Sequence, residues 1–457
     1  MGYGIITLLP ALLVIVVAIK SKRTTEALLI GCVSSYLIIA TANKSNPVTL
    51  MVDSFFKVVT DYDTVWLLIV CGLFGSLIAV INAARGTHAI ANFLGKICKT
   101  DKSTLLTSWI LGIIIFVDDY MNIMTISACT KKLSDSRKVP REALAYVIDS
   151  TGAPVCVLLP FSTWAIFYAS VFGKEPAVAA LNYGSDIATY LKVIPFTFYA
   201  WASVIIVPLF ILGIIPKIGK MKDAYKRVET TGKVYGETSS KFNSDLLDEY
   251  ANGEGKLIDF LLPMGVLIGM TIISGDLFIS VIAALFVCLV LYVPRKKMTF
   301  DEFCDIYIRG FCDMVPTIAI VFMAFVMQQA ANDIGLPNYV IETVAPYLNG
   351  DIFPAVSFIV VALLTFITGS NWGIPAVCVP IILPLGASLG ANLVLVMAAV
   401  LSGGALGSHA CFYSDATVLT SSSCSIDNMD HALSQIPYAL IASAVSLAGF
   451  LICGFIL

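Results

Sequence analysis

Charged residues are scarce in this 457-residue chain. Only 13% of its residues are Asp, Glu, Lys or Arg, whereas soluble domains typically carry roughly 25%. Hydrophobic residues make up 58%, and the formal net charge of −3 is too small to indicate a nucleic-acid partner. The composition excludes an ordinary soluble domain and predicts an all-α polytopic membrane protein whose main partner is the lipid bilayer.

Histidine and clustered cysteine are also sparse. The chain has three histidines, and its twelve cysteines are scattered with no CxxC motif and no Cys/His cluster. Zinc sites and disulfide frameworks need such clusters, so we expect packing thiols and no cofactor apart from Na⁺ as a transported or coupling ion. No nucleophile has an evident base partner, which argues against a membrane enzyme.

What the chain does contain is a series of apolar runs, each long enough for a helix to cross about 30 Å of hydrocarbon. Basic residues mark the cytoplasmic ends of such runs. Lys20, Lys22 and Arg23 therefore place the first loop inside and the N-terminus outside a cytoplasmic (plasma) membrane. The predicted spans lie near residues 4–19, 26–42, 64–83, 190–215, 257–275, 277–293, 313–332 and 434–457.

The stretch "IFVDDYMN" places two adjacent acids in an apolar segment, residues 104–130. Basic residues flank this segment on both sides, so both of its ends are expected in the cytoplasm and the segment is predicted to be a re-entrant hairpin. Asp118 and Asp119 lie near its tip. The next segment, residues 143–171, contains glycine and prolines that interrupt regular hydrogen bonding, and we interpret it as a discontinuous helix.

The same order of hairpin and broken helix recurs later in the chain, but it starts from the opposite side of the membrane. A second hairpin is predicted over residues 353–390 and a second broken helix over residues 392–421. Two such halves, residues 1–216 and 257–457, joined by a polar cytoplasmic linker over residues 217–256, form the inverted-topology repeat of secondary transporters. We expect about ten transmembrane helices, two hairpins and two discontinuous helices.

Polar side chains gather at the breaks, and neither hairpin and neither broken helix contains Lys or Arg. Acids without basic partners in apolar surroundings must hold a proton or a cation. The candidates for cation and proton binding are Asp118, Asp119, Asn122, Asp149, Ser150, Thr151 and Asp415, with Na⁺ at Asp118, Asp119 or Asp149. The candidates for a substrate or second half-site are Ser162, Thr163, Thr368, Ser370, Asn371, Ser408, His409, Ser414 and Thr417.

Structural roles compete with these assignments. The adjacent acids could fix the hairpin tip by accepting backbone N–H groups, and Asp149 could cap the restarted helix. His409 could be a packed core histidine instead of a proton relay. His88 and His431 lie near predicted cytoplasmic edges, where solvation is expected.

Four ordered stretches carry a resemblance to a known family. They are "IFVDDYMNIMT", "REALAYVIDSTGAPVCVLLPFSTW", "FITGSNWGIPAVCVPIILPL" and "GSHACFYSDATVLTSSSC". At these residues the chain resembles the NhaC-type sodium/proton antiporters of the ion-transporter superfamily. The resemblance implies paired hairpins with two broken helices, an elevator-type movement and a homodimer. Relatives commonly have Gly-Asp-His where this chain has Gly407, Ser408 and His409.

Cation/proton antiport is the leading functional hypothesis. Sodium-coupled transport of an amino acid or small organic carboxylate is the alternative, favoured by Ser408 and by the aromatic residues Trp164, Trp372, Phe412 and Tyr413. The two differ in whether Na⁺ flux needs an organic solute. An ion channel, which also tolerates broken helices, fits inverted halves less well.

Overall fold

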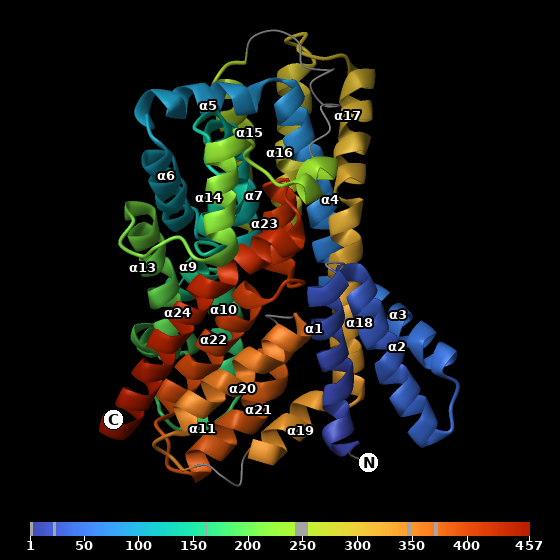
Figure 1. The fold of residues 1–457 in the computed structure, drawn as a ribbon, viewed down its shortest axis with the longest axis vertical. Coiled ribbons are helices and arrows are strands. Elements are labelled where there is room, and N and C mark those ends of the chain that lie inside the picture. The colour runs from blue at the N-terminus through green and yellow to red at the C-terminus, as the bar shows by residue number, and fades with distance from the viewer. Residues whose placement is uncertain (1–2, 22–23, 161, 243–254, 345–348, 370–372) are drawn as a thin grey trace.

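The computed structural model describes residues 3–21, 24–160, 162–242, 255–344, 349–369 and 373–457, and Figure 1 shows their arrangement. Within these ranges every regular element is a helix and no strand occurs. Five helices are long and apolar enough to cross a membrane, or up to seven if each of two bent pairs counts as one span. The prediction of an all-α chain with several apolar spans is confirmed.

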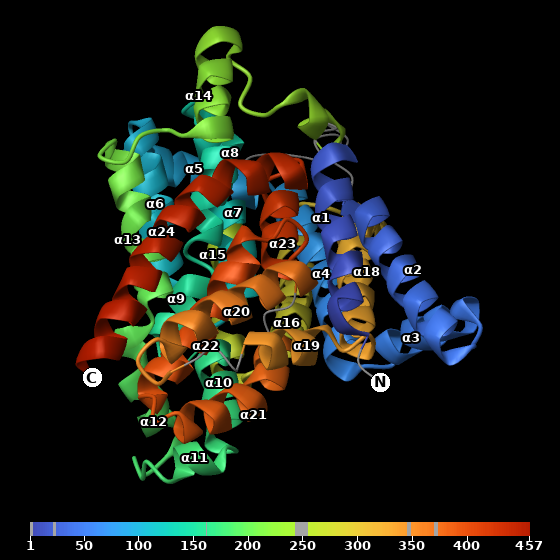
Figure 2. The ribbon, with the colours of Figure 1, turned by 60° about the horizontal axis from the view of Figure 1, so that its bottom comes forward.

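The N-terminal helices form one side of the molecule, where α1 to α3 lie beside α18 (Figures 1 and 2). Asn46 caps α3 by accepting the backbone N–H of Val48, and Pro47 begins the helix without losing a hydrogen bond. The bounds in this part are η1 (Gly4–Leu8), α1 (Leu9–Ser21), α2 (Thr24–Asn43), α3 (Pro47–Val59), α4 (Tyr62–Ala83) and α5 (Gly86–Ile97).

Two bent helix pairs follow the first hairpin. The pair Arg141–Leu158 and Thr163–Gly173 bends by 45°, and the pair Asp186–Phe196 and Phe198–Leu212 bends by 52°. The second bend corrects the single straight span expected over 190–215, because Pro195 lacks the N–H that a continuous helix needs. The bounds are α6 (Asp101–Ile114), α7 (Asp119–Ser136), α8 (Arg141–Asp149), α9 (Ala153–Leu158), α10 (Thr163–Gly173), α11 (Pro176–Ala179), α12 (Asp186–Val193), η2 (Ile194–Phe196) and α13 (Phe198–Leu212).

The polar linker is folded against the helices over its described part. It contains α14 (Gly219–Thr231) and η3 (Glu237–Phe242). Arg227 of α14 forms a two-pronged ion pair with Glu142 of α8, at 2.8 and 2.9 Å. In Figure 2, α14 protrudes at one end of the molecule.

The second part of the chain contains the longest helices. The span predicted over residues 313–332 corresponds to α18, and α17 is nearly continuous with it, so that Phe300–Asp333 forms one candidate span of 34 residues. The bounds are α15 (Ile258–Ser274), α16 (Leu277–Tyr292), α17 (Phe300–Asp313), α18 (Val315–Asp333), α19 (Leu336–Val344), α20 (Phe353–Thr368), α21 (Gly373–Ser388), α22 (Leu393–Ala410), α23 (Asp415–Ser423) and α24 (Asn428–Ile456).

Two helix pairs have the shape of hairpins. In the first pair, α6 and α7, the end of α7 returns to α5, the helix just before α6, where Arg137 donates to the carbonyl oxygen of Gly95 at 3.0 Å. The far ends of the second pair, α20 and α21, meet where Gly350 lies against the backbone of Leu389. The first pair lies toward α5 and α14, whereas the second lies toward the part with both termini (Figures 1 and 2).

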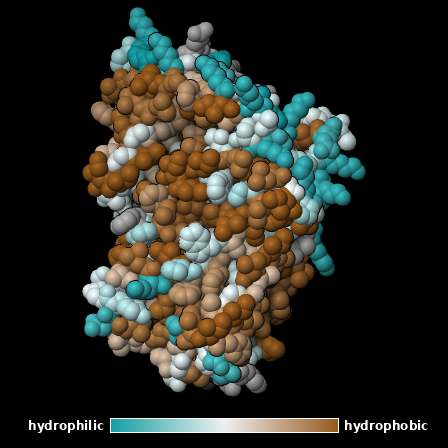
Figure 3. Space-filling view, turned by 90° about the vertical axis from the view of Figure 1, so that its left-hand side faces the viewer, coloured by the Kyte–Doolittle hydropathy of each residue, from teal (hydrophilic) through white to brown (hydrophobic). Residues whose placement is uncertain are grey.

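The surface of the bundle suits a lipid environment. Figure 3 shows that hydrophobic residues cover most of one lateral face, while hydrophilic residues gather at its upper and right-hand edges. Large exposed apolar side chains include Ile273, Phe286 and Ile456. A continuous apolar surface of this kind would be unstable in water and is expected to contact hydrocarbon.

Candidate functional site

Three helices restart in the interior, and each begins at a polar cap. Asp118 caps α7 by accepting the backbone N–H of Met121 at 3.0 Å. Ser162 caps α10 and Ser414 caps α23 in the same way, through Ala165 and Thr417. These caps satisfy N–H groups that would otherwise be exposed in an apolar interior.

Asp118 is a structural acid in this arrangement. Its second oxygen accepts the hydroxyl of Thr163 at 3.2 Å, and the backbone N–H of Thr163 donates to the carbonyl oxygen of Val117 at 2.9 Å. Asp118 therefore joins the break after α6 to the start of α10. This geometry matches the expectation that one of the adjacent acids fixes the hairpin tip.

The carboxylate of Asp119 has different surroundings from that of its neighbour. Its side chain is 0% exposed, and neither carboxylate oxygen has a hydrogen-bond partner among the residues that the structure describes. Asp118 and Asp415 lie within electrostatic range of it, and the indole of Trp164 lies nearby. An unpaired buried carboxylate costs at least a few kcal/mol, so Asp119 must hold a proton or a cation.

Asn122 lies one turn further along α7 and closes the hairpin. Its amide nitrogen donates to the carbonyl oxygens of Gly112 and Ile115, at 2.7 and 2.5 Å. These carbonyls belong to the end of α6, where no helical partner remains. The amide oxygen of Asn122 and the hydroxyl of Thr125 are buried without hydrogen-bond partners in the described ranges.

Asp415 joins the first hairpin to the second broken helix. Its Oδ2 accepts the hydroxyl of Tyr120 at 2.6 Å, and its Oδ1 accepts the backbone N–H of Ala416 at 2.8 Å. The contact brings residues almost 300 positions apart into one cluster. Sequence reasoning selected Asp415 but missed Tyr120, which looked like an ordinary apolar aromatic.

Asp149 contacts three side chains through one carboxylate oxygen. Its Oδ2 accepts the amide of Gln435 at 2.6 Å and the hydroxyl of Thr417 at 3.3 Å, and lies 3.1 Å from Nε2 of His431. Asp149 does not cap the restarted helix, because α9 begins after Gly152 without a side-chain cap. The expectation of a solvated His431 is wrong, since its side chain is fully buried.

His409 forms a second buried polar group beside Asp149. Its Nε2 lies 3.0 Å from the hydroxyl of Ser150, and its Nδ1 lies 2.6 Å from the hydroxyl of Tyr199. Gln435 also donates to the backbone carbonyl oxygen of His409. Gln435 therefore links the Asp149 group to the His409 group.

The remaining candidates divide into three sets. Ser408 contributes its carbonyl oxygen to Ser414 and Thr417, while its own hydroxyl is buried without a hydrogen-bond partner in the part of the chain described. The hydroxyls that bond back to nearby backbone carbonyls belong to Thr151, Ser162 and Thr368. Ser370, Asn371 and Trp372 lie outside the described residues.

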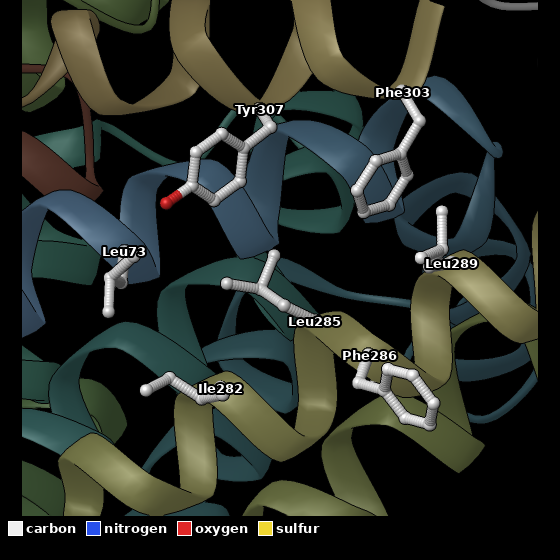
Figure 4. A pocket seen from close by; sticks show the side chains of 7 residues that line it. All are labelled: Leu73, Ile282, Leu285, Phe286, Leu289, Phe303 and Tyr307. Atoms are coloured by element: carbon white, nitrogen blue, oxygen red, sulfur yellow. The ribbon is translucent and has the colours of Figure 1, made fainter. Parts of the chain in front are cut away.

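Within the described ranges, the acids of this site do not form a conventional metal centre. Among the described residues, no group of three or more His, Cys, Asp or Glu side chains could hold a metal ion. The pocket in Figure 4 lies between α4, α16 and α17 and is lined by Leu73, Ile282, Leu285, Phe286, Leu289, Phe303 and Tyr307. It contains no candidate residue, so it is separate from the acid cluster.

The sequence did contain a signal for the missed residues of α24. His431 and Gln435 are four positions apart, so a helix places them on one face. Their neighbours "IDNMDH" are polar, and this polarity led to the prediction of a solvated edge. Tyr120 and Tyr199 had no such signal.

Comparisons with known proteins agree with this architecture. A family model described as the Na⁺/H⁺ antiporter family matches residues 177–455, more than half of the chain. A protein of Haemophilus influenzae described as uncharacterized is 24% identical over 488 residues, which cover 98% of this chain and 91% of the relative. The malate-2H⁺/Na⁺-lactate antiporter of Bacillus subtilis is 28% identical over 109 residues, only 24% of this chain and 23% of the relative. The chain therefore belongs to the Na⁺/H⁺ antiporter family.

Proposed function

We propose that this protein exchanges Na⁺ for protons across the membrane and that Asp119 is the carboxylate that binds the cation. The observation that carries the proposal is the fully buried Asp119 side chain, whose oxygens have no hydrogen-bond partner among the described residues. Its charge has to be neutralised by a proton or by a small cation. Competition between the two at one carboxylate that is presented to each side of the membrane in turn is sufficient for exchange.

Neighbouring groups fit this role. The amide oxygen of Asn122 and the hydroxyl of Thr125 are buried and without hydrogen-bond partners in the described ranges, and they follow Asp119 on α7. Oxygen atoms of these types are suitable ligands for a hard cation. Asp118, by contrast, already accepts two hydrogen bonds and supports the helix start.

The exchange step requires that the site opens to each side in turn. We propose that residues 1–216 and 257–457 form the two inverted halves, with about ten transmembrane helices, and that their hairpins enter from opposite sides. The placement of α6–α7 toward α14, and of α20–α21 toward the termini, supports this proposal (Figures 1 and 2). The linker over residues 217–256 would then be cytoplasmic in a plasma membrane, and a homodimer remains an expectation from the family.

The test is a transport assay in proteoliposomes that contain a pH-sensitive dye. A Na⁺ gradient, imposed with no organic solute and with the membrane potential clamped, should produce a saturable internal pH change. Asp119→Asn should reduce this change to the level of protein-free liposomes, because the amide can neither carry the proton nor neutralise the cation. Asp223→Asn, the same chemical change at an exposed linker position, is the matched control and should retain exchange.

Two results would contradict the proposal. Exchange in Asp119→Asn at the rate of the unaltered protein would exclude this carboxylate as the site. A Na⁺-driven pH change that occurs only after malate, lactate or an amino acid is added would identify the protein as an organic-solute transporter instead. Malate and lactate are chosen for this experiment because a short stretch of the chain is similar to a malate-2H⁺/Na⁺-lactate antiporter.

A further inference from the structure

The junction between α13 and α14 carries a group of exposed lysines beside apolar surface. Lys217 and Lys220 follow the end of α13, and Lys99 and Lys102 flank the start of α6. The two pairs come together because Nζ of Lys102 donates to the carbonyl oxygen of Leu212, the last residue of α13, at 3.0 Å. We call these four lysines the lysine cluster.

Two of the ammonium groups are held in place by the fold. Lys102 is fixed by its hydrogen bond to the carbonyl oxygen of Leu212, one of the carbonyls that have no helical partner at the end of α13. Nζ of Lys217 lies 3.4 Å from the centre of the Tyr225 ring on α14, a cation–π contact. An ammonium has three N–H donors, so each of these groups keeps donors for an anion.

The charge of this surface is positive although acids are present. The ring of Tyr225 is within electrostatic range of Asp101, the residue before Lys102, so the two fixed cations belong to one region. The second acid is Asp223, whose carboxylate lies 4.0 Å from Nζ of Lys220. Both side chains of that pair are largely exposed, so water screens their attraction. Four lysines against two acids leave an excess of positive charge.

Exposed apolar side chains adjoin the lysine cluster. Leu212 is 51% exposed, and Ile214, which lies between it and Lys217 in the chain, is 68% exposed. They follow on α13, a helix composed almost entirely of apolar residues. The hydrophobic lateral face of the bundle meets a hydrophilic edge in the same way in Figure 3. In a membrane, lysines at such a boundary lie at the level of the lipid headgroups.

A ligand for this surface has to suit both kinds of residue. A soluble polyanion, such as a nucleic acid or an acidic protein, would pair with the lysines but leave Leu212 and Ile214 in water. A lipid without net charge would cover these apolar side chains but gain little from the excess of lysine. An anionic phospholipid covers the apolar side chains with its acyl chains and places its phosphate at the ammonium groups.

We propose that the lysine cluster binds the headgroup of an anionic phospholipid, whose acyl chains lie along Leu212 and Ile214. Phosphate oxygens accept N–H donors from Lys102 and Lys217, and the other two lysines add to the attraction. The lipid thereby connects α6, α13 and α14 and holds the helix of the linker against the bundle. Binding of this lipid is independent of what the protein transports.

The test measures lipid binding by native mass spectrometry of the full chain in a non-ionic detergent. The protein is titrated with phosphatidylglycerol and, in parallel, with phosphatidylcholine that has the same acyl chains. The unaltered protein should bind phosphatidylglycerol more tightly. Lys217→Gln/Lys220→Gln should weaken this binding by about 10-fold or more, because each lysine near an anionic lipid contributes roughly 5-fold to affinity. Binding of phosphatidylcholine should not change.

The matched control is the double variant Lys174→Gln/Lys192→Gln. Both lysines are exposed, and they lie next to α11 and within α12, at the end of the molecule opposite α14 in Figure 2. This control should bind phosphatidylglycerol like the unaltered protein. The proposal fails if the unaltered protein binds the two lipids equally, if the cluster variant keeps the affinity of the unaltered protein, or if both double variants lose the same affinity.

A second measurement uses the unaltered protein alone. Phosphatidylglycerol should raise the midpoint of thermal unfolding above its value in phosphatidylcholine, because it binds the folded chain. The difference should shrink in about 1 M choline chloride, which screens charges beyond about 3 Å and adds no Na⁺. A difference that persists at this ionic strength would contradict a contact between the headgroup and the lysines. Equal stabilisation by inorganic phosphate would show that the surface binds a soluble anion instead of a lipid.

Discussion

At the scale of single residues, the two adjacent acids differ because a helix begins between them. Asp118 has an extended backbone, φ −148° and ψ 139°, which directs its carboxylate to the N–H groups of the first turn. Asp119 is already helical, so its side chain points away from those donors and has none of its own in the described ranges. Of these two adjacent acids, Asp118 caps the helix, whereas the carboxylate of Asp119 is left to hold a proton or a cation.

Asn122 provides a prediction about stability. Asn122→Leu should lower the free energy of unfolding by about 1–3 kcal/mol, because it leaves the carbonyls of Gly112 and Ile115 buried without a donor. The measurement is the midpoint of thermal unfolding in detergent. Thr125→Val is the matched control on the same helix, since its hydroxyl has no hydrogen-bond partner to lose. Equal midpoints for the two variants would contradict this account.

Sequence reasoning selected several of the buried acids for a physical reason. Acids such as Asp118, Asp119 and Asp415 are conspicuous in apolar segments because their burial is costly. His431 was missed because its local surroundings are polar, and its burial depends on contacts with Asp149, 282 positions earlier. Local composition does not report contacts of this range.

At the scale of helices, glycine determines how closely two elements approach. α22 packs along α20, and a Cβ atom on Gly407 would lie 2.4 Å from Cβ of Thr365 and 2.6 Å from the carbonyl oxygen of Ala362. A Cβ atom on Gly403, one turn earlier, would lie 2.8 Å from the carbonyl oxygen of Phe358. Small residues four positions apart permit this backbone contact between membrane helices. The contact lies just before the break at residues 411–414, after which α23 begins at Asp415.

The contact leads to a second prediction about stability. Gly407→Ala should destabilise the protein by about 1–3 kcal/mol, because α20 and α22 would have to move apart to make room for the added methyl group, and this would disturb their packing. Gly265→Ala on α15 is the control, since nothing lies within 4 Å of the added atom. That control should be neutral or stabilising by up to about 1 kcal/mol, the helix preference of alanine over glycine. A lower unfolding midpoint in Gly265→Ala than in Gly407→Ala would contradict the steric argument.

The bends and the linker show why hydropathy and composition alone did not predict the whole fold. Hydropathy predicted spans over 190–215 and 313–332, but Pro195 bends the first and α17 extends the second. Composition predicted a polar linker, yet it could not show that Arg227 pairs with Glu142 or that Thr238 meets Asp430. Hydropathy measures the affinity of a segment for lipid, whereas these features depend on specific partners elsewhere in the fold.

At the scale of the whole molecule, the two hairpins are the feature that relates the fold to exchange. The end of the first returns to α5, the helix just before it, through Arg137 and Gly95, and the ends of the second meet at Gly350 and Leu389. In the proposed arrangement, a hairpin from each side would place two breaks in the interior, where exposed backbone groups line a polar region. We propose that a site built in this way is reached from either side when one half moves against the other.

The sidedness of the hairpins is testable with two matched positions. Ser136 ends α7 and Ser388 ends α21; both are exposed, and each hydroxyl bonds to the carbonyl oxygen three residues earlier at 2.7 Å. In a background where the three incompletely buried cysteines, Cys304, Cys312 and Cys453, are replaced by serine, Ser136→Cys should react with an impermeant thiol reagent only from the cytoplasmic side. Ser388→Cys should react only from outside.

An internal reference makes the result decisive. Lys222→Cys lies on α14, at the end of the molecule toward which the first hairpin lies, so its labelling should follow that of Ser136→Cys. The nine buried cysteines should stay unreactive from both sides, because their thiols do not contact solvent. If Ser136→Cys and Ser388→Cys react from the same side, the hairpins do not enter from opposite faces. The inverted repeat would then be wrong, and alternating access to Asp119 would need a different explanation.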